Sequence, residues 1–178
     1  LGDVDMRQLF VSDNHGDRAI LQKIAARFSN EVDIMLHCGD SNLEPSDPVM
    51  QPFKTVIGNT DWGLDYPQSR LAVSDQERIL VVHGHLYQVN FTLTPLMLLA
   101  KEQRATIAAY GHTHQLAVEF NQGTLYLNPG SISQPRGQYQ NIGGTLAIVM
   151  ADSNKLDVQY YDRRMQPIND LHFVFLRQ

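Results

Sequence analysis

The sequence predicts an α/β (α+β) fold in which two packed β-sheets are flanked by helices. Short apolar runs typical of buried strands recur along the whole chain. In the first half these runs alternate with an amphipathic helical segment, which favours parallel crossover units. In the second half closely spaced strand candidates are joined by turn signals, which favours hairpins.

The first half begins with an apolar run at residues 8–12, which predicts a buried strand ending at Asp13. A helix is expected over 17–28, because its apolar residues recur at helical spacing and polar residues fall outside that stripe. Two further buried strands are expected at 32–38 and 54–57. Ligands collect outside the carboxyl ends of strands in sheets of this kind, so a site is expected there.

The second half carries one predicted helix, at residues 94–104, among many short strands. Two turn signals, the Asn-Gln-Gly of residues 121–123 and the Asp-Ser-Asn of residues 152–154, predict hairpins. No linker, low-complexity tract or repeat interrupts the sequence, so we expect a single domain over 1–178. The predicted strands of this half lie at 71–74, 78–82, 106–110, 116–120, 124–128, 144–150, 155–161 and 171–176.

Five fragments with metal-binding side chains each come at the end of a predicted strand. Together they offer carboxylates, an amide oxygen and several imidazoles, but no thiolate. Such a set can hold two divalent cations that share a bridging carboxylate, the arrangement used to displace a group from phosphorus. The fragments are Ser12-Asp13-Asn14-His15-Gly16, Gly39-Asp40, Gly58-Asn59-Thr60-Asp61, His83-Gly84-His85 and Gly111-His112-Thr113-His114.

These residues also have ordinary structural explanations. Taken alone, Asp13 could stabilise a helix N-terminus, and Asp40 and Asn59 could be turn residues. If each residue had only a structural role, the order of the five fragments would require several independent coincidences. The metal site is therefore the preferred interpretation. We treat His37, inside a strand run, and His172, near the C-terminus, differently and expect packing or solvent exposure for both.

Composition restricts the classes of protein to consider. The 178 residues suffice for a sizeable core, and a net charge of −5 without a basic stripe argues against general nucleic-acid binding. No apolar run approaches the length of a membrane span, so no membrane association is expected. The single cysteine, Cys38, excludes an intrachain disulfide and is expected to be a small buried residue. With no signal-like N-terminal segment, the sequence favours a cytoplasmic protein.

The order of these motifs resembles the calcineurin-like metallophosphoesterases, whose pattern is Asp-x-His, Gly-Asp, Gly-Asn, a later His and Gly-His-x-His. A closer likeness is to the small bacterial and archaeal YfcE-type phosphodiesterases. They share the Gly-Asn-x-Asp, the His-Gly-His and a downstream Asn-Pro-Gly-Ser, here residues 128–131. The resemblance covers residues 9–150 and does not include the strands expected over 151–178. It implies a four-layer αββα sandwich of two mixed β-sheets, with a dimetal site at the sheet edge.

Carried over residue by residue, the resemblance implies two metal sites that share one carboxylate, that of Asp40. A bridging carboxylate reduces the repulsion between two dications held roughly 3.5–4 Å apart. Neutral amide and imidazole ligands keep the site positive enough to attract a phosphate ester. The first ion would also be bound by Asp13, His15 and His114, and the second by Asn59, His83 and His112.

The position of Thr60 bears on the substrate. Many phosphomonoesterases of the wider superfamily have a histidine there, which contacts the substrate and helps the leaving group depart. Threonine cannot act as a general acid at neutral pH, so phosphodiesters with good leaving groups are favoured. His85 could partly replace the missing acid. It could instead hydrogen-bond a metal ligand without binding the metal itself.

Substrate contacts are predicted for Asn59, Thr60 and Arg136. Arg136 could bind phosphate through its fork of donors, or could be an ordinary surface loop residue. The residues assigned to catalysis are Asp40, Asn59, His83 and His85.

The expected reaction is hydrolysis of a small phosphodiester by in-line attack of a metal-bridging hydroxide, with manganese as the preferred ion. Iron, zinc, nickel or cobalt also suit the donor set. Two alternatives stay open: a phosphomonoesterase acting on a small metabolite, and a protein-binding scaffold like the retromer subunit Vps29, whose metal site is degraded. Thr60 counts against the first, and the complete ligand set counts against the second. The sequence names no natural substrate and leaves a homo-oligomer as one option.

Overall fold

The structure is a computed structural model that describes residues 5–178. Within them it has eleven β-strands, two α-helices and three short 3₁₀ turns. The elements are β1 (Met6–Val11), α1 (Arg18–Phe28), β2 (Ile34–His37), η1 (Pro48–Met50), β3 (Phe53–Thr55), β4 (Ser69–Val73), β5 (Arg78–Val82), η2 (His85–Tyr87), α2 (Thr94–Glu102), β6 (Ile107–Ala109), β7 (Ala117–Asn121), β8 (Thr124–Asn128), η3 (Gln140–Ile142), β9 (Thr145–Ala151), β10 (Lys155–Asp162) and β11 (Pro167–Leu176).

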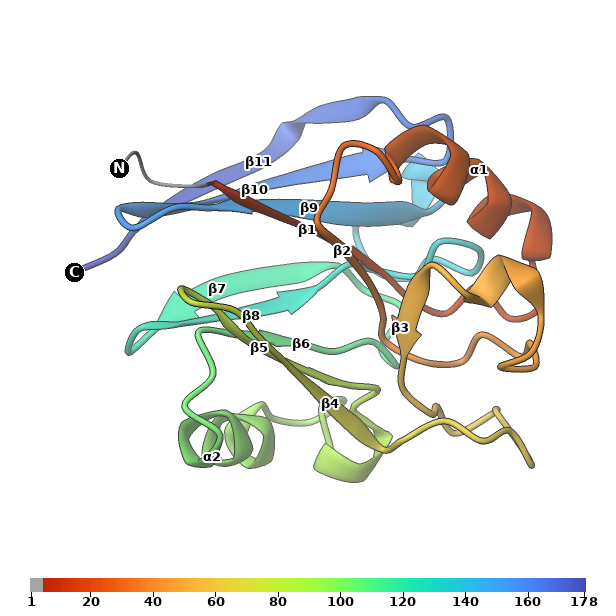
Figure 1. Ribbon diagram of the computed structural model, residues 1–178, viewed down its shortest axis with the longest axis horizontal. Helices are drawn as coiled ribbons and strands as arrows, with labels where there is room; N and C mark the ends of the chain where they lie inside the picture. The colour runs from red at the N-terminus through yellow and green to blue at the C-terminus, as the bar shows by residue number, and fades with distance from the viewer. Residues whose placement is uncertain (1–4) are drawn as a thin grey trace.

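The strands form two mixed sheets that pack face to face (Figure 1). The first sheet has the order β11-β10-β9-β1-β2-β3 and the second the order β4-β5-β6-β8-β7. Strands β1, β2 and β3 are mutually parallel, as are β5, β6 and β8, while the other neighbours run antiparallel. The predicted fold of two mixed sheets flanked by helices is therefore confirmed.

Three apolar clusters hold the four layers together. The central one joins the inner faces of both sheets, with Phe10 and Leu36 from the first facing Ile79 and Leu127 from the second. A second cluster seats α1 on the outer face of the first sheet, and a third seats α2 on the outer face of the second (Figure 1). Over residues 5–178 no helix is both long and apolar enough to cross a bilayer.

The predicted elements are all present, with differences at their ends. Strands β5 and β8 have the predicted bounds, and the turn at 121–123 places Gln122 and Gly123 at positive φ, as a tight hairpin requires. Strand β11 begins at Pro167, four residues before the predicted strand. Three of its first four residues are exposed and only Ile168 packs against the central core, so no run of apolar residues marks this start. Strand β2 begins at Ile34, later than predicted.

The sheet topology brings the sequence motifs together. Strands β1, β2 and β3 are parallel, so they end at one edge of the first sheet, and β5, β6 and β8 do the same in the second. The five metal-binding fragments and the Asn-Pro-Gly-Ser segment each follow or close one of these six strands. The fold thereby places all six at carboxyl ends of strands, where open sheets bind ligands.

We predict that Tyr160→Phe lowers the free energy of unfolding by about 1–2 kcal/mol, because the Tyr160 hydroxyl links the two sheets. Tyr160 lies on β10 and is fully buried, and its hydroxyl is 2.7 Å from the Asn128 carbonyl oxygen and 3.1 Å from that of Ala117. Urea unfolding measures the loss. Tyr161→Phe, on the same strand but without a hydrogen bond from its hydroxyl in the described part of the chain, is the control, and equal losses in both variants would contradict the prediction.

Candidate metal centre

Five of the seven predicted metal ligands have a left-handed backbone. L-residues other than glycine rarely adopt positive φ, because Cβ then lies too close to the carbonyl oxygen. Strain of this kind persists only where the surrounding structure holds it, and it clusters at functional sites. The residues and their φ angles are Asp13 (56°), His15 (42°), Asp40 (56°), His112 (70°) and His114 (61°).

Two glycines of the motifs are required by close packing against the carboxylates. A Cβ atom on Gly58 would collide with the Asp40 carboxylate and backbone nitrogen. On Gly111 it would collide with the Ser12 hydroxyl and with Oδ2 of Asp13. The glycine of Gly-Asn therefore lets two neighbouring loops of the first sheet approach each other, and the glycine of Gly-His-x-His lets a loop of the second sheet approach one of the first.

The first predicted ligand group is assembled around Asp13. Nε2 of His114 lies 3.3 Å from Oδ1 of Asp13, and Nε2 of His15 lies 3.7 Å from the same oxygen. The two histidine Nε2 atoms are 3.2 Å apart. Asp13 and His114 are buried, while His15 is partly exposed. These three donor atoms therefore converge on one point, as a metal ion requires.

The second group is assembled around Asp40. Nε2 of His83 lies 3.2 Å from Oδ2 of Asp40. Oδ1 of Asn59 lies 3.0 Å from this Nε2 and 3.0 Å from Nδ1 of His112. Oδ2 of Asp40 is also 3.9 Å from Nε2 of His15, a member of the first group. Asp40 thus stands between the two groups, where a bridging carboxylate would be.

The donor set fits divalent cations. Two sets of donor atoms each lie within 4.8 Å of one another, those of Asp13, His15 and His114 and those of Asp13, Asp40 and His83. Oδ1 of Asp13 is buried and has no hydrogen-bond partner among the described residues. A buried carboxylate oxygen without a partner is costly, and a cation would compensate it. Oxygen and imidazole donors without thiolate suit several first-row divalent ions.

The surrounding charges keep both carboxylates ionised. Burial acts to raise the pKa of Asp13, but its close contact with His114 and the charge of His83 outweigh burial and hold this pKa below its usual value. Burial opposes ionisation of Asp40 as well, and contacts with His83 and Thr60 lower its pKa. Burial acts to lower the pKa of the His83 imidazole, but the neighbouring carboxylates of Asp40 and Asp13 outweigh burial and raise this pKa.

Backbone carbonyls orient the histidines. Nδ1 of His83 is 2.7 Å from the carbonyl oxygen of Cys38, and Nδ1 of His114 is 2.7 Å from that of Gln134. A carbonyl only accepts, so each Nδ1 carries the proton and leaves Nε2 free to bind a cation. Cys38 is buried, and burial raises the pKa of its thiol, which agrees with the expected packing role.

Asp61 organises the loop that carries Asn59, a role that the sequence reasoning did not assign. The Asp61 carboxylate is buried and accepts hydrogen bonds from the backbone of Asp40 at 2.9 Å, Gly58 at 2.8 Å and Asn42 at 2.9 Å. Asn42 also holds Nδ1 of His15 at 3.2 Å. The acidic position of the Gly-Asn-x-Asp motif was the available signal for Asp61, whereas no motif pointed to Asn42.

The Asn-Pro-Gly-Ser segment fastens the second sheet to the first metal-binding loop. Ser131 donates its hydroxyl to the Asp13 carbonyl at 2.8 Å and accepts from the Gln134 amide at 2.8 Å. The Asn128 side chain donates to the carbonyl of Gly111 at 3.1 Å. The segment therefore positions the Asp13 and His114 loops and supplies no predicted metal ligand itself.

The three remaining predicted site residues differ in their surroundings. The Thr60 hydroxyl accepts a hydrogen bond from Asn42 at 3.0 Å and so faces the ligand loops. The His85 ring lies 5.4 Å from the His83 ring, yet over residues 5–178 His85 makes no hydrogen bond and its Nδ1 is buried. His85 therefore makes no hydrogen bond through which it could orient a metal ligand, which was the second role considered for it. Arg136 donates its backbone amide to His114, and its side chain is exposed.

The two histidines assigned to other roles lie as expected. His37 is fully buried, and its Nδ1 accepts a hydrogen bond from the Gly39 amide at 3.0 Å. The ring proton is therefore on Nε2, which donates to Oδ1 of Asn14 at 2.8 Å. His172 is exposed and lies 2.7 Å from Asp157 on the neighbouring strand.

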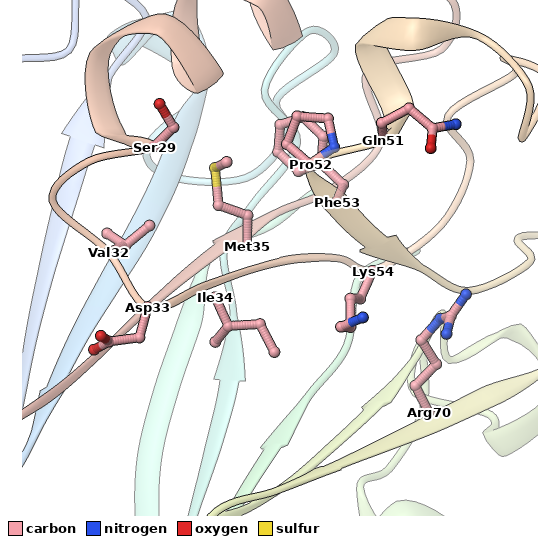
Figure 2. Close-up of a pocket in the computed structure, with 10 residues that line it drawn as sticks. All are labelled: Ser29, Val32, Asp33, Ile34, Met35, Gln51, Pro52, Phe53, Lys54 and Arg70. Atoms are coloured by element: carbon pink, nitrogen blue, oxygen red, sulfur yellow. The ribbon is translucent and has the colours of Figure 1, made fainter.

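A pocket of about 370 Å³ is lined by none of the residues described so far as ligands. Figure 2 shows the residues that line it. It is lined by the starts of β2 and β3, including Ile34 and Phe53, together with Lys54 and Arg70. None of the predicted metal ligands lines it. Because the ligands follow the other ends of the same strands, this pocket is not part of the metal centre.

Comparison with known proteins agrees with this geometry. The family model of the calcineurin-like phosphoesterase superfamily domain matches residues 6–154. The chain belongs to this superfamily. It is 38% identical over 166 residues to the probable metallophosphoesterase YsnB of Bacillus subtilis, covering 93% of this chain and 96% of that protein. It is 31% identical over 157 residues to a probable metallophosphoesterase of Methanothermobacter thermautotrophicus, with coverage of 84% and 88%.

Solved structures of similar shape include phosphoesterases and Vps29 proteins. A predicted phosphoesterase from Streptococcus pneumoniae has a TM-score of 0.93 and 34% identity, covering 98% of this chain and 99% of that chain. The E. coli phosphoesterase YfcE has a TM-score of 0.65 and 20% identity, with coverage of 97% and 100%. Vps29 of Cryptosporidium parvum has a TM-score of 0.72 and 17% identity, with coverage of 98% and 97%. The last two share the fold alone.

We predict that Asp40→Asn lowers the metal content of the protein from two ions per chain and reduces phosphodiester hydrolysis by at least about 100-fold. A neutral amide cannot replace an anionic bridge between two dications. Elemental analysis and circular dichroism on the same sample separate metal loss from unfolding. Asp157→Asn, at a carboxylate on β10 outside the predicted site, is the matched control. An Asp40→Asn protein that keeps two ions and full turnover would refute the bridging role.

We predict that His37 makes the metal-free protein less stable as the pH falls from 6.5 to 4. Burial lowers the pKa of His37 to about 4, against 6.5 in an unfolded chain. Between these values the unfolded state binds more protons, so protonation costs folding up to about 3 kcal/mol. Urea unfolding in a chelator should show a shallower pH dependence for His37→Gln than for the wild type. Parallel curves would contradict the prediction.

Proposed function

We propose that the protein is a dimetal-dependent phosphodiesterase that hydrolyses small phosphodiesters. The observation that carries the proposal is the convergence of five further ligand side chains on Asp13 and Asp40, from the carboxyl ends of strands in both sheets, in a member of a phosphoesterase superfamily. Manganese is the proposed ion among those that such donors accept. We further propose a small-molecule substrate and a cytoplasmic location.

The roles follow from the position of each side chain. Asp13, His15 and His114 would hold one ion, Asn59, His83 and His112 the other, and Asp40 both. Bound divalent ions supply an activated water and neutralise the phosphate charge. The backbone loops keep the ligand atoms fixed before substrate arrives, so little reorganisation accompanies the reaction.

Selectivity for diesters rests on the residue after Asn59. At this position the protein has Thr60, whose hydroxyl is hydrogen-bonded to Asn42 and cannot protonate a leaving group at neutral pH. His85 is the nearby alternative acid, and burial lowers the pKa of its imidazole, so it is largely neutral at pH 7. Substrates whose leaving group departs without protonation, such as aryl or strained cyclic diesters, are therefore favoured. Asn59 and Arg136 are the further proposed contacts to the phosphate.

A protein-binding scaffold is the second candidate, because several structural neighbours are Vps29 proteins. The complete set of donors in this chain favours the enzyme. Elemental analysis of the purified protein distinguishes the two: a scaffold would retain little metal, and added metal would restore no hydrolysis.

We predict that the manganese-loaded protein hydrolyses bis(p-nitrophenyl) phosphate clearly faster than an alkyl phosphomonoester. A site that activates water but does not protonate the leaving group should depend steeply on the leaving-group pKa. Thr60→His should raise monoester hydrolysis by up to about 100-fold if the new imidazole reaches the leaving oxygen. Thr94→His, at an exposed position on α2, is the control. Faster hydrolysis of alkyl monoesters than of aryl diesters by the wild type would make the phosphomonoesterase alternative the correct one.

A further inference from the structure

The largest exposed side chain near the predicted ligands is that of Trp62. It is 87% exposed and is the only tryptophan of the chain. Scattered exposed apolar residues are normal, but an indole in water beside a ligand loop is a costly surface feature and a frequent binding element. The position of Trp62 therefore needs its own explanation.

Hydrogen bonds hold the backbone next to Trp62 in place, although the indole ring of Trp62 is exposed. The preceding residue, Asp61, is 1% exposed and its carboxylate accepts backbone hydrogen bonds from Asp40 and Gly58. Two consecutive turns frame the segment, with the Asp61 amide 3.3 Å from the Gly58 carbonyl and the Leu64 amide 3.2 Å from the Asp61 carbonyl. The indole is thus presented from a rigid support, which lowers the entropy lost on binding a ligand.

Trp62 is also within reach of the predicted phosphate site. It follows the predicted ligand Asn59 by three residues, so their Cα atoms are at most about 11 Å apart. Asn59 is itself exposed, and its oxygen contacts His83 and His112. An ester substituent on a phosphate bound over Asn59 can therefore extend to the indole.

We propose that Trp62 is a stacking platform for a planar aromatic group on the phosphodiester, a nucleobase or an aryl ring. The proposal rests on the proposed function and names its substrate class. Stacking needs no charge, which suits a protein without a basic stripe. The segment after His83 also exposes Leu86 and Phe91, so a second ligand-bearing loop offers apolar surface.

The test uses binding and not turnover. The intrinsic fluorescence of the metal-loaded protein comes chiefly from Trp62, so a stacked base should quench it directly. AMP should quench saturably, whereas ribose 5-phosphate, which lacks the base, should not. Calorimetry should show that Trp62→Ala weakens AMP binding about 10-fold and leaves inorganic phosphate binding unchanged. Trp62→Phe should keep most of the affinity, and Leu176→Ala, at an exposed position on β11, should keep all of it.

Phenyl phosphate, titrated in parallel, distinguishes the two sources of the ring. Selective loss of AMP affinity in Trp62→Ala assigns a nucleobase, and selective loss of phenyl phosphate affinity assigns an aryl group. Equal affinity of AMP and ribose 5-phosphate in the wild type and in Trp62→Ala overturns the inference. The inference is also overturned if AMP does not change the fluorescence but protein concentration does, because Trp62 would then be assigned to self-association. If AMP stacks and phosphate binds but no diester is hydrolysed, the proposed function fails and the stacking site stands.

Discussion

Burying Asp13 and Asp40 next to each other sets the conditions that the rest of the site must satisfy. Two ionised carboxylates out of water are costly unless opposite charge or hydrogen bonds compensate them. Here His83 lies 3.2 Å from one and 3.8 Å from the other, and backbone amides approach the remaining oxygens. Oδ1 of Asp13 still lacks a hydrogen bond within residues 5–178. This buried, unpaired carboxylate oxygen is the physical reason to expect a cation there.

The fold meets this condition by joining two sheets at one edge. Each sheet alone supplies an incomplete donor set, because Asp13, Asp40 and Asn59 follow strands of the first sheet and the histidines of residues 83, 112 and 114 follow strands of the second. The central core holds the sheets face to face, and the Ser131 bond to the Asp13 carbonyl joins them at the site itself. The same constraint explains the glycines of the motifs and the left-handed ligand residues, since the loops must meet without room for extra atoms.

The sequence was sufficient for the features that have a local signal. Apolar runs located every strand, and the helical spacing of Ile20, Ile24 and Phe28 located α1. The motif order located the predicted ligands, whose side chains the structure brings together. Features that depend on contacts between distant segments had no such signal: the Asn42 bond to His15 and the exposed ring of Trp62 could not be derived from spacing. The exposed start of β11 was missed because only Ile168 among its first four residues packs against the core.

The central claim is that this member of the calcineurin-like superfamily holds two ions that share the Asp40 carboxylate. Anomalous X-ray scattering from crystals of the manganese-loaded protein measures this most directly. Our account predicts two peaks, one among Asp13, His15 and His114 and one among Asn59, His83 and His112, with the Asp40 carboxylate between them. A single peak, or peaks outside this cluster, would contradict it.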